Sequence, residues 1–377
     1  MRDPGHAALG AWSGGRFMHF GSELDEDRLV GLLAPREDIP AVLTADVYGQ
    51  GEADRLVGRA LAGRPRDDYW LAGAVGHDFY AGTRAGARGF PRFTDPALRA
   101  PDGYADYLRE ATERSLERLG VERFDLLLLH NPDRTGYTDA RVWEGMAALR
   151  EAGLTRLLGV APGPANGFTL DVLACLERFG DLIDWAMLIL NPLEPWPGEL
   201  VLPAAEAKGV RVIARVVDYG GLFWDDVRAG HEFAQGDHRA FRPEGWVEAG
   251  RERIERMRPV ATRHGLSMFS LAGAWCLAHP AVQCLAPTLI QEAGPDARPV
   301  EAKRAELAAV PPGRIFSAAE LEEIRAIGDN TGCMALKGAA PDFEGDERPD
   351  RWALTPELAE LGRRWGIEAE RDLAPAA

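Results

Sequence analysis

Eight short apolar runs alternate along this chain with longer stretches that mix charged and apolar residues. Both faces of each run are apolar, which is typical of parallel strands covered by helices on both sides. Eight strands alternating with helices favour a closed barrel over an open sheet, so we predict an α/β protein, a (β/α)8 TIM barrel. The runs cover residues 8–12, 41–45, 69–75, 124–130, 155–161, 185–190, 210–217 and 282–287.

Two regions interrupt the alternation of strands and helices. Residues 218–245 form a long loop rich in glycine and aspartate, and residues 329–377 follow the last barrel helix. Long loops at the mouth of a barrel are usually functional. Neither region has the features of a separate domain. We therefore expect one (β/α)8 barrel with long mouth loops over residues 1–328, and a C-terminal extension over residues 329–377 that packs on it.

The chain is acidic, with a net charge of −16 at pH 7. Such a charge repels phosphate backbones and anionic membranes, so we expect neither nucleic acid nor a membrane as a partner. The sequence has no run of eighteen apolar residues and no secretory signal, and its four cysteines are scattered without CxxC spacing. These features indicate buried thiols and a cytoplasmic protein. The histidines lack a spacing such as HxxxH, so we predict no metal site.

Polar side chains follow the ends of several predicted strands. In barrels of this type the chemistry is concentrated at the carboxyl ends of the strands, so we expect these side chains to form one ring at the mouth. The ring is rich in groups that can act as acids or bases. Its members are Asp46, Tyr48, His77, Asp78, His130, Asn131, Asp133, Asn191, Glu194, Arg215, Asp218 and Tyr219.

Three segments resemble sequences of the aldo/keto reductase family. The segment TADVYGQGEADRLVGRAL is similar to the family's DTADVYGxGxSExxLGxAL, and SLERLGVERFDLLLLHNPD is similar to SLxxLGxxxxDLxLxHxPD. The segment WEGMAALREAGLTRLLGVA resembles WxxLxxLxxxGxxRxxGVS. Several matches in the correct order, over roughly residues 8–330, are far more specific than a single motif. The chain is therefore identified as a divergent member of this family.

The family's reductases use a tetrad of Asp, Tyr, Lys and His. The resemblance places the Tyr on Tyr48 and the His on His130, and it implies that Tyr48 donates a proton to a carbonyl that His130 orients. The Asp position is Leu43 and the Lys position is Ala74, so the tetrad is degenerate. The replacement of both residues together is consistent with their role as a pair, because an Asp or a Lys alone would be a buried charge without a partner. Without a cation nearby, Tyr48 should keep a pKa near about 10.

The resemblance also implies NAD(P)(H) as cofactor, with Arg215, Asn191 and Gly221 as cofactor-binding residues. Several cofactor positions depart from the family pattern. The family's GVSN after the fifth strand reads GVAP here, and Met187 stands where the sixth strand usually carries a Gln. The segment that grips the cofactor phosphates reads APTLIQEAGPDARP, with no basic residue before Arg298.

Further residues near the mouth are candidates for the site. His77 lies three residues after Ala74 and is predicted either to supply a catalytic base or cation or to be a loop histidine bonded to backbone. Aromatic side chains on mouth loops stack on sugars or pack in the core, and Lys337 either restores a positive charge or is a solvated surface residue. For Asp46 the alternative is a turn cap. The predicted substrate-binding residues are Asp46, Asn131, Trp196, Trp224 and Lys337.

Three functions are consistent with this pattern. The first is an oxidoreductase of the family that acts on a small carbonyl or sugar-like substrate with NAD(P)(H). The second is a non-redox lyase, dehydratase or isomerase on a carbohydrate-like substrate, with Tyr48, His130 and His77 as acid/base groups. The third is a non-catalytic binding protein on the same fold. Each implies a small-molecule partner, none indicates an oligomeric state, and fold alone does not decide among them.

Overall fold

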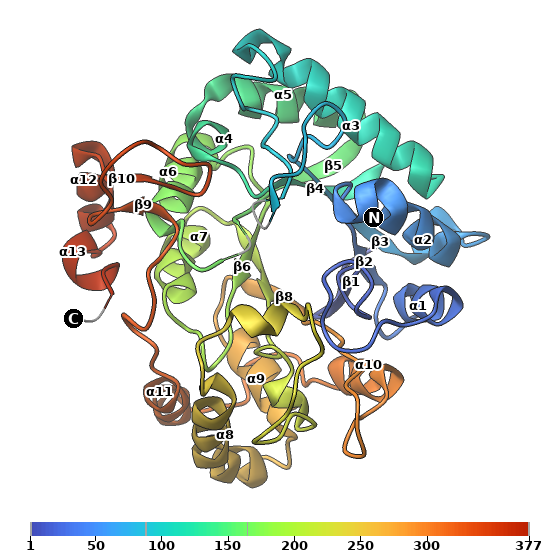
Figure 1. The fold of residues 1–377 in the computed structure, drawn as a ribbon, viewed down its shortest axis with the longest axis vertical. Coiled ribbons are helices and arrows are strands. Elements are labelled where there is room, and N and C mark those ends of the chain that lie inside the picture. Colours follow the sequence, from blue (N-terminus) through green and yellow to red (C-terminus); the bar gives the residue numbers. More distant parts are fainter. Residues whose placement is uncertain (1, 87–88, 164, 376–377) are drawn as a thin grey trace.

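The computed structural model describes residues 2–86, 89–163 and 165–375. Its centre is a parallel sheet in which each strand pairs with the next along the chain. A bridge between Ala7 and Leu285 brings the last strand back to the first, which gives the nearly closed barrel seen in Figure 1. The predicted fold class is confirmed, and each strand lies within its predicted run. The strands are β1 (Ala8–Gly10), β2 (Ala41–Leu43), β3 (Trp70–Val75), β4 (Phe124–His130), β5 (Thr155–Ala161), β6 (Trp185–Ile189), β7 (Arg211–Arg215) and β8 (Val282–Ala286).

Helices surround the barrel and bury their apolar faces against it (Figure 1). None of the helices within the described ranges combines the length and the apolar character needed to cross a bilayer. The helices between the strands and after β8 are α1 (Glu26–Leu33), α2 (Glu52–Leu61), α3 (Tyr104–Leu119), α4 (Arg134–Thr138), α5 (Ala140–Glu151), α6 (Thr169–Phe179), α7 (Leu202–Ala207), α8 (Trp246–Arg263), α9 (Met268–Leu277), α10 (Val300–Ala308) and α11 (Ala318–Ile327).

Apolar side chains fill the interior of the barrel. Trp70 begins β3 and Trp185 begins β6, and the centroids of their rings lie 5.9 Å apart. Leu43 in β2 and Ala74 in β3 belong to the same buried cluster, nearer the carboxyl ends of their strands. The interior is therefore a packed core, in which a charged side chain would lie away from water.

The C-terminal extension lies along the outside of the barrel, beside α6 (Figure 1). Two short parallel strands, β9 (Gly338–Ala340) and β10 (Arg351–Ala353), precede α12 (Pro356–Arg364) and α13 (Ala369–Asp372). The buried carboxylate of Asp171 in α6 accepts hydrogen bonds from Ala339 N and from Trp352 Nε1, each at 2.9 Å. Asp171 thereby joins the extension to the barrel wall.

Candidate active site

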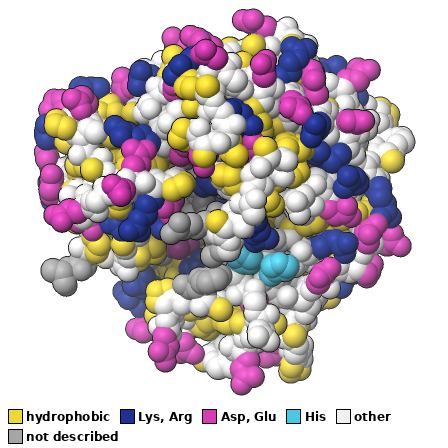
Figure 2. All heavy atoms as spheres, turned by 45° about the horizontal axis from the view of Figure 1, so that its top comes forward, with side chains coloured by type: hydrophobic (Ala, Val, Ile, Leu, Met, Phe, Trp, Pro, Cys, Tyr) yellow, Lys and Arg dark blue, Asp and Glu magenta, His cyan; other side chains and the backbone are white. Residues whose placement is uncertain are grey.

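A cavity of about 500 Å³ opens at the carboxyl ends of the barrel strands, and we call it the mouth cavity. Histidine side chains lie near the middle of the molecular face drawn in Figure 2. Six of the residues predicted from strand ends line the cavity, and they are Tyr48, His130, Asn131, Glu194, Arg215 and Asp218. The other lining residues are Trp12, Met18, Phe20, Ala165, Asn166, Met187, Ile189, Val216, Gly220, His238, Arg239, Arg242, Pro243, Thr288, Ile290 and Met334.

Tyr48 enters the mouth cavity from a tight turn after β2. It begins the 3-10 helix η1 (Tyr48–Gly51), in which Gly49 and Gly51 have φ angles of 58° and 93° that glycine adopts without a Cβ clash. Burial raises the pKa of Tyr48 to about 12, against the opposing effect of Arg215. The pKa is thus higher than the sequence led us to expect, although a cation does act on the ring. The hydroxyl stays protonated at neutral pH and can donate a hydrogen bond.

His130 ends β4 and lies against Tyr48. The centroids of the two rings are 5.8 Å apart and the ring planes meet at 89°. Burial lowers the pKa of His130 to about 3, and the positive charges of Arg92 and Arg215 act in the same direction. Its Nδ1 atom is buried and has no hydrogen-bond partner among the described residues. The imidazole is therefore neutral at physiological pH, and Nε2 is the nitrogen left to face a ligand.

His77 follows β3 and lies behind His130, with ring centroids 5.2 Å apart. Its Nδ1 atom lies 3.1 Å from Phe90 O and 3.0 Å from Arg92 Nη1, and its Nε2 atom lies 3.0 Å from Asn131 Nδ2. Burial, followed by the Arg92 charge, lowers the pKa of His77 well below its usual value. Whichever tautomer the ring adopts, both nitrogens contact protein groups. His77 is placed to orient Asn131, and it does not line the mouth cavity.

Arg215 ends β7 and brings a positive charge to the cavity. Its Nη2 atom donates to Pro162 O at 3.2 Å and to Gly163 O at 2.5 Å. No carboxylate in the described ranges lies within ion-pair distance of Arg215, and its Nε atom is buried without a partner. Burial lowers the pKa of Arg215, while the Tyr48 ring raises it. The cavity therefore contains a guanidinium whose charge no neighbouring acid directly neutralises.

Leu43 and Ala74, the positions that the resemblance assigns to the tetrad Asp and Lys, lie outside the residues that line the mouth cavity. Leu43 is 1% exposed and Ala74 is 5% exposed, both inside the barrel cluster. Asp46 is also buried, outside the residues that line the mouth cavity, and neither carboxylate oxygen has a partner among the described residues. Burial, followed by repulsion from Asp54, raises the pKa of Asp46 well above its usual range. Asp46 therefore does not line the cavity in which it was predicted to bind substrate.

Three other predicted substrate contacts lie away from the mouth cavity. Trp196 is buried and donates from Nε1 to Asp372 O at 2.7 Å. Trp224 stacks on Phe269 at 3.6 Å between ring centroids, and its Nε1 atom donates to Thr288 O. Lys337 forms an ion pair with Asp350 at 2.7 Å. The two tryptophans therefore pack within the structure, and Lys337 binds within the C-terminal extension.

Two predicted cofactor residues support the mouth loops from below. Asn191 is fully buried, and its Nδ2 atom donates to Val216 O at 3.0 Å and to Glu194 Oε2 at 3.1 Å. Gly221 N donates to Asp218 Oδ2 at 3.0 Å. Neither Asn191 nor Gly221 lines the mouth cavity, although their neighbours do.

Sequence reasoning did not single out Arg242, a second cation of the mouth cavity. Arg242 follows the 3-10 helix η7 (His238–Phe241) in the long loop after β7. Its guanidinium lies 4.4 Å from the ring centroid of Tyr219 and 4.9 Å from that of Trp246. Its contacts to the Glu194 carboxylate are long, at 3.4 Å and 3.5 Å. A basic residue in a loop after a barrel strand, next to an aromatic residue, was the available signal.

Arg242 is the cavity cation through which a cofactor phosphate could be held, because the segment to which the resemblance assigns that contact has its donors engaged within the protein. In the segment after β8, Thr288 N already donates to Asp218, and Arg298 donates to Trp224 O and pairs with Glu306. The loosely paired Arg242 can instead meet phosphate oxygens from the loop after β7. No group of three His, Cys, Asp or Glu side chains in the described part of the chain is arranged to hold a metal.

Comparisons with known proteins agree with this architecture. The sequence profile of the aldo/keto reductase family matches residues 39–293. An aldo-keto reductase of Mycolicibacterium smegmatis is 36% identical over 148 residues, and the match covers 38% of this chain and 50% of that relative. The chain thus spans half the length of that relative.

A 6-dehydroglucose reductase of Novosphingobium aromaticivorans is 28% identical over 247 residues, and the match covers 63% of this chain and 67% of that relative. The glycerol dehydrogenase structure from Gluconobacter oxydans has a TM-score of 0.66 at 23% identity, with 87% and 94% covered.

Proposed function

The chain belongs to the aldo/keto reductase family, and we propose that it is an oxidoreductase that acts on a small carbonyl or sugar-like substrate with NAD(P)(H). The observation that carries this proposal is the convergence of Tyr48, His130 and Arg215 on one cavity at the barrel mouth. The 6-dehydroglucose reductase among the relatives supports a sugar-related substrate class.

Tyr48 is the proposed proton donor. A carbonyl oxygen that gains negative charge at the Tyr48 hydroxyl would take its proton, as in general acid catalysis. A buried phenol with a pKa of about 12 is a weak acid, so a nearby cation matters. Arg215 opposes the effect of burial on the pKa of Tyr48. Arg215 therefore takes over part of the role that the tetrad Lys has in the family, from a different strand.

His130 is the proposed orienting group. The neutral imidazole has Nδ1 buried, so a protonated Nε2 can donate to the same carbonyl oxygen. Two neutral donors at one oxygen would position the carbonyl without adding a charge to the cavity. Asn131, held by His77, supplies a further amide at the cavity wall.

When bound, NAD(P)(H) supplies or accepts the hydride in this reaction. Arg242 and the Asn166 amide are the residues that we propose to hold it, because both line the cavity and both have only long contacts to Glu194. Arg215 lies where the resemblance places a nicotinamide contact.

Titration with NADPH and with NADH, followed by tryptophan fluorescence and by calorimetry, tests this proposal. We expect one of the two cofactors to bind, and Arg242→Ala to weaken its binding about tenfold or more through loss of a charged contact. Arg55→Ala removes an exposed arginine of α2 that pairs with Glu52, and it should leave binding unchanged. Absence of binding of either cofactor up to millimolar concentration would overturn the redox proposal.

A non-redox lyase, dehydratase or isomerase is the second candidate. The observation that favours it is the segment after β8, whose donors Thr288 N and Arg298 are already used inside the protein. Such a reaction needs an acid and a base but no phosphate grip. Turnover of a carbohydrate-like substrate without added cofactor, lost in Tyr48→Phe and His130→Ala, would establish this alternative.

A further inference from the structure

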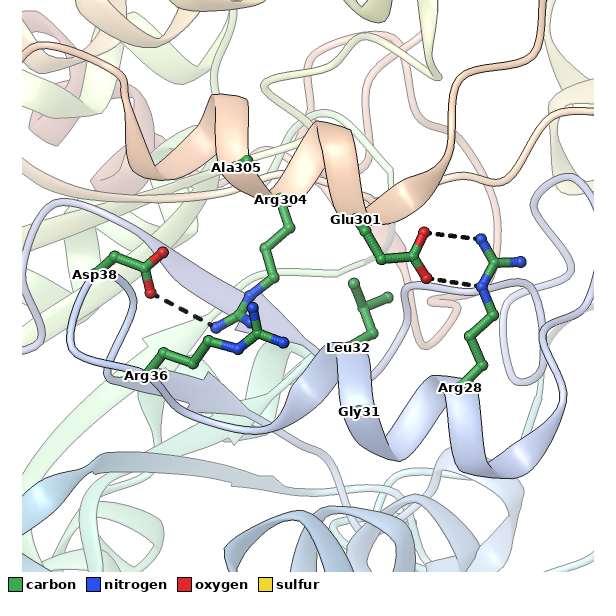
Figure 3. Close-up of a pocket in the computed structure, with 8 residues that line it drawn as sticks. All are labelled: Arg28, Gly31, Leu32, Arg36, Asp38, Glu301, Arg304 and Ala305. Atoms are coloured by element: carbon green, nitrogen blue, oxygen red, sulfur yellow. Dashed lines mark hydrogen bonds and ion pairs between the residues drawn. The ribbon is translucent and has the colours of Figure 1, made fainter.

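A second cavity of about 250 Å³ lies between α1 and α10, on the outer wall of the barrel (Figure 3). Its lining comes from α1, from the loop that leads into β2, and from α10. None of the residues that line it also lines the mouth cavity. We call it the wall cavity. The wall cavity is therefore a separate feature from the candidate active site.

Arg304 of α10 is a buried guanidinium with unused donors. Its side chain is 4% exposed, and Nη2 donates to Ala34 O at 3.2 Å. Its Nε and Nη1 atoms are buried with no hydrogen-bond partner among the described residues. The closest carboxylate oxygen in an ion pair with it is Oδ1 of the half-exposed Asp38, at 3.9 Å. Burial lowers the pKa of Arg304 to about 10. A buried cation with open N–H groups is costly unless an anion meets it.

Arg36 adds a second positive charge at the same point. Its side chain is exposed, and no acidic residue in the described ranges forms an ion pair with it. Figure 3 shows the guanidinium ends of Arg36 and Arg304 converging, and the repulsion between them also lowers the pKa of Arg304. Two like charges that converge without a bridging acid form an arrangement that an anion between them would stabilise.

Arg28, the third arginine of the wall cavity, differs from Arg36 and Arg304 because it has a close acidic partner. Arg28 forms a two-point ion pair with Glu301, at 2.7 Å and 2.9 Å, and also donates to Gln291. Arg28 is therefore neutralised, whereas Arg304 has only the distant Asp38 and Arg36 has no acidic partner among the described residues. The chain as a whole has a net charge of −16, so an unneutralised arginine pair does not reflect a generally basic surface.

The wall cavity also has room beside the arginines. A Cβ atom built on Gly31, in the middle of α1, meets no heavy atom within 4 Å. Gly31 is exposed and lines the wall cavity, so it leaves open space at a position where any other residue would project a side chain. The free volume suits a small molecule rather than a macromolecule.

We propose that the wall cavity binds the phosphate group of a small metabolite, with Arg36 and Arg304 donating to its oxygens. Guanidinium groups bind phosphate through paired N–H bonds in a fixed plane, which the open donors of Arg304 and the exposed Arg36 can supply. Inorganic phosphate presents the same oxygens, so the ligand is either the free ion or a phosphate monoester. The site is independent of the reaction at the mouth.

Calorimetry of the full chain with inorganic phosphate and with glycerol 3-phosphate tests this proposal, against sodium chloride of equal ionic strength. We expect saturable binding of phosphate, and Arg36→Gln should weaken it about tenfold or more. Tighter binding of glycerol 3-phosphate would identify a monoester as the ligand, and equal binding would identify the free ion. Arg109→Gln removes an exposed arginine of α3 and should bind as the wild type does.

Substitutions at Gly31 keep the proposal falsifiable if arginine variants fold poorly. Gly31→Leu should fill the space and abolish phosphate binding, while the smaller Gly31→Ala should keep most of it, and both substitutions favour the helix. Unchanged binding in Gly31→Leu, or no phosphate binding by the wild type, would overturn the proposal. Loss of binding in Arg242→Ala would also overturn it, since the anion would then lie at the mouth cavity.

Discussion

Two adjacent layers of the barrel differ in their chemistry. The mouth layer, made of Tyr48, His130 and Arg215, keeps polar groups that face a cavity. The layer beneath it, which includes Leu43 and Ala74, is apolar and fully packed. A charged group persists in a protein where a ligand, water or a partner can reach it, and it is lost from a closed layer once its partner is lost. The cation that acts on Tyr48 therefore comes from the side, from Arg215.

The largest effect on stability should follow from placing a charge in the apolar layer beneath the mouth layer. Ala74→Lys would bury an ammonium group among apolar side chains with no acid beside it. We expect a loss of about 3–5 kcal/mol in the free energy of unfolding, the usual range for an uncompensated buried charge. Urea denaturation followed by circular dichroism measures this loss.

The double variant Leu43→Asp with Ala74→Lys sharpens the same comparison. Here the two new charges can pair, so the double variant should be more stable than Ala74→Lys alone. The restored cation should also lower the pKa of Tyr48, as followed by ultraviolet titration of its phenol. Equal stability of the single and double variants would mean that the lower layer is not closed to water.

A substitution in the mouth layer should change the activity of the protein and not its stability. Tyr48→Phe removes the proposed proton donor, and turnover should fall by about 10²–10⁴-fold. The unfolding transition should stay close to that of the wild type, because none of the described residues forms a hydrogen bond with the Tyr48 hydroxyl. Tyr69→Phe, just before β3 at the other end of the barrel, is the matched control and should keep full activity. A fully active Tyr48→Phe variant would refute the placement of the site.

The neutral state of His130 predicts a dependence of stability on pH. Its pKa is about 3 in the folded protein, below its value of about 6.5 in the unfolded chain. Between pH 3 and pH 6.5 the unfolded chain therefore binds more protons than the folded protein. The contribution of neutral His130 to the free energy of unfolding is present above pH 6.5 and is lost as the pH falls towards 3. Relative to His130→Gln, the wild type should lose about 1.4 kcal/mol per pH unit across this window. A constant difference between the two proteins from pH 7 to pH 4 would show that folding does not lower the pKa of His130.

The smallest effect on stability should come from Asp46, a buried residue outside both layers. Burial raises the pKa of Asp46 well above its usual range and so disfavours its charge, and Asp46→Asn removes that charge with little change in size. The free energy of unfolding at pH 7 should change by less than about 1 kcal/mol. A much larger loss would reveal a charged carboxylate with a stabilising partner.

The fold could be read from the sequence because its signals are local. Each apolar run sets a strand, and the alternation with helices sets the barrel, so all eight strands occur within their predicted ranges. The same rule places Tyr48, His130 and Arg215 at strand ends, where they meet at one cavity. The absence of charge at Leu43 and Ala74 was likewise visible in the sequence, at the positions that the resemblance assigns to the tetrad Asp and Lys.

Contacts between distant segments were decided only by the tertiary structure. Arg92 contacts His77, 15 positions away in the chain, and Arg242 contacts Glu194, 48 positions away. No periodicity encodes such pairs, because the path of a loop depends on what it packs against. For the same reason, the sequence did not show that Trp196 and Trp224 are buried. The sequence alone thus determined the barrel and its polar strand ends, while packing decided which charges are neutralised, at the mouth and at the pair of Arg36 and Arg304.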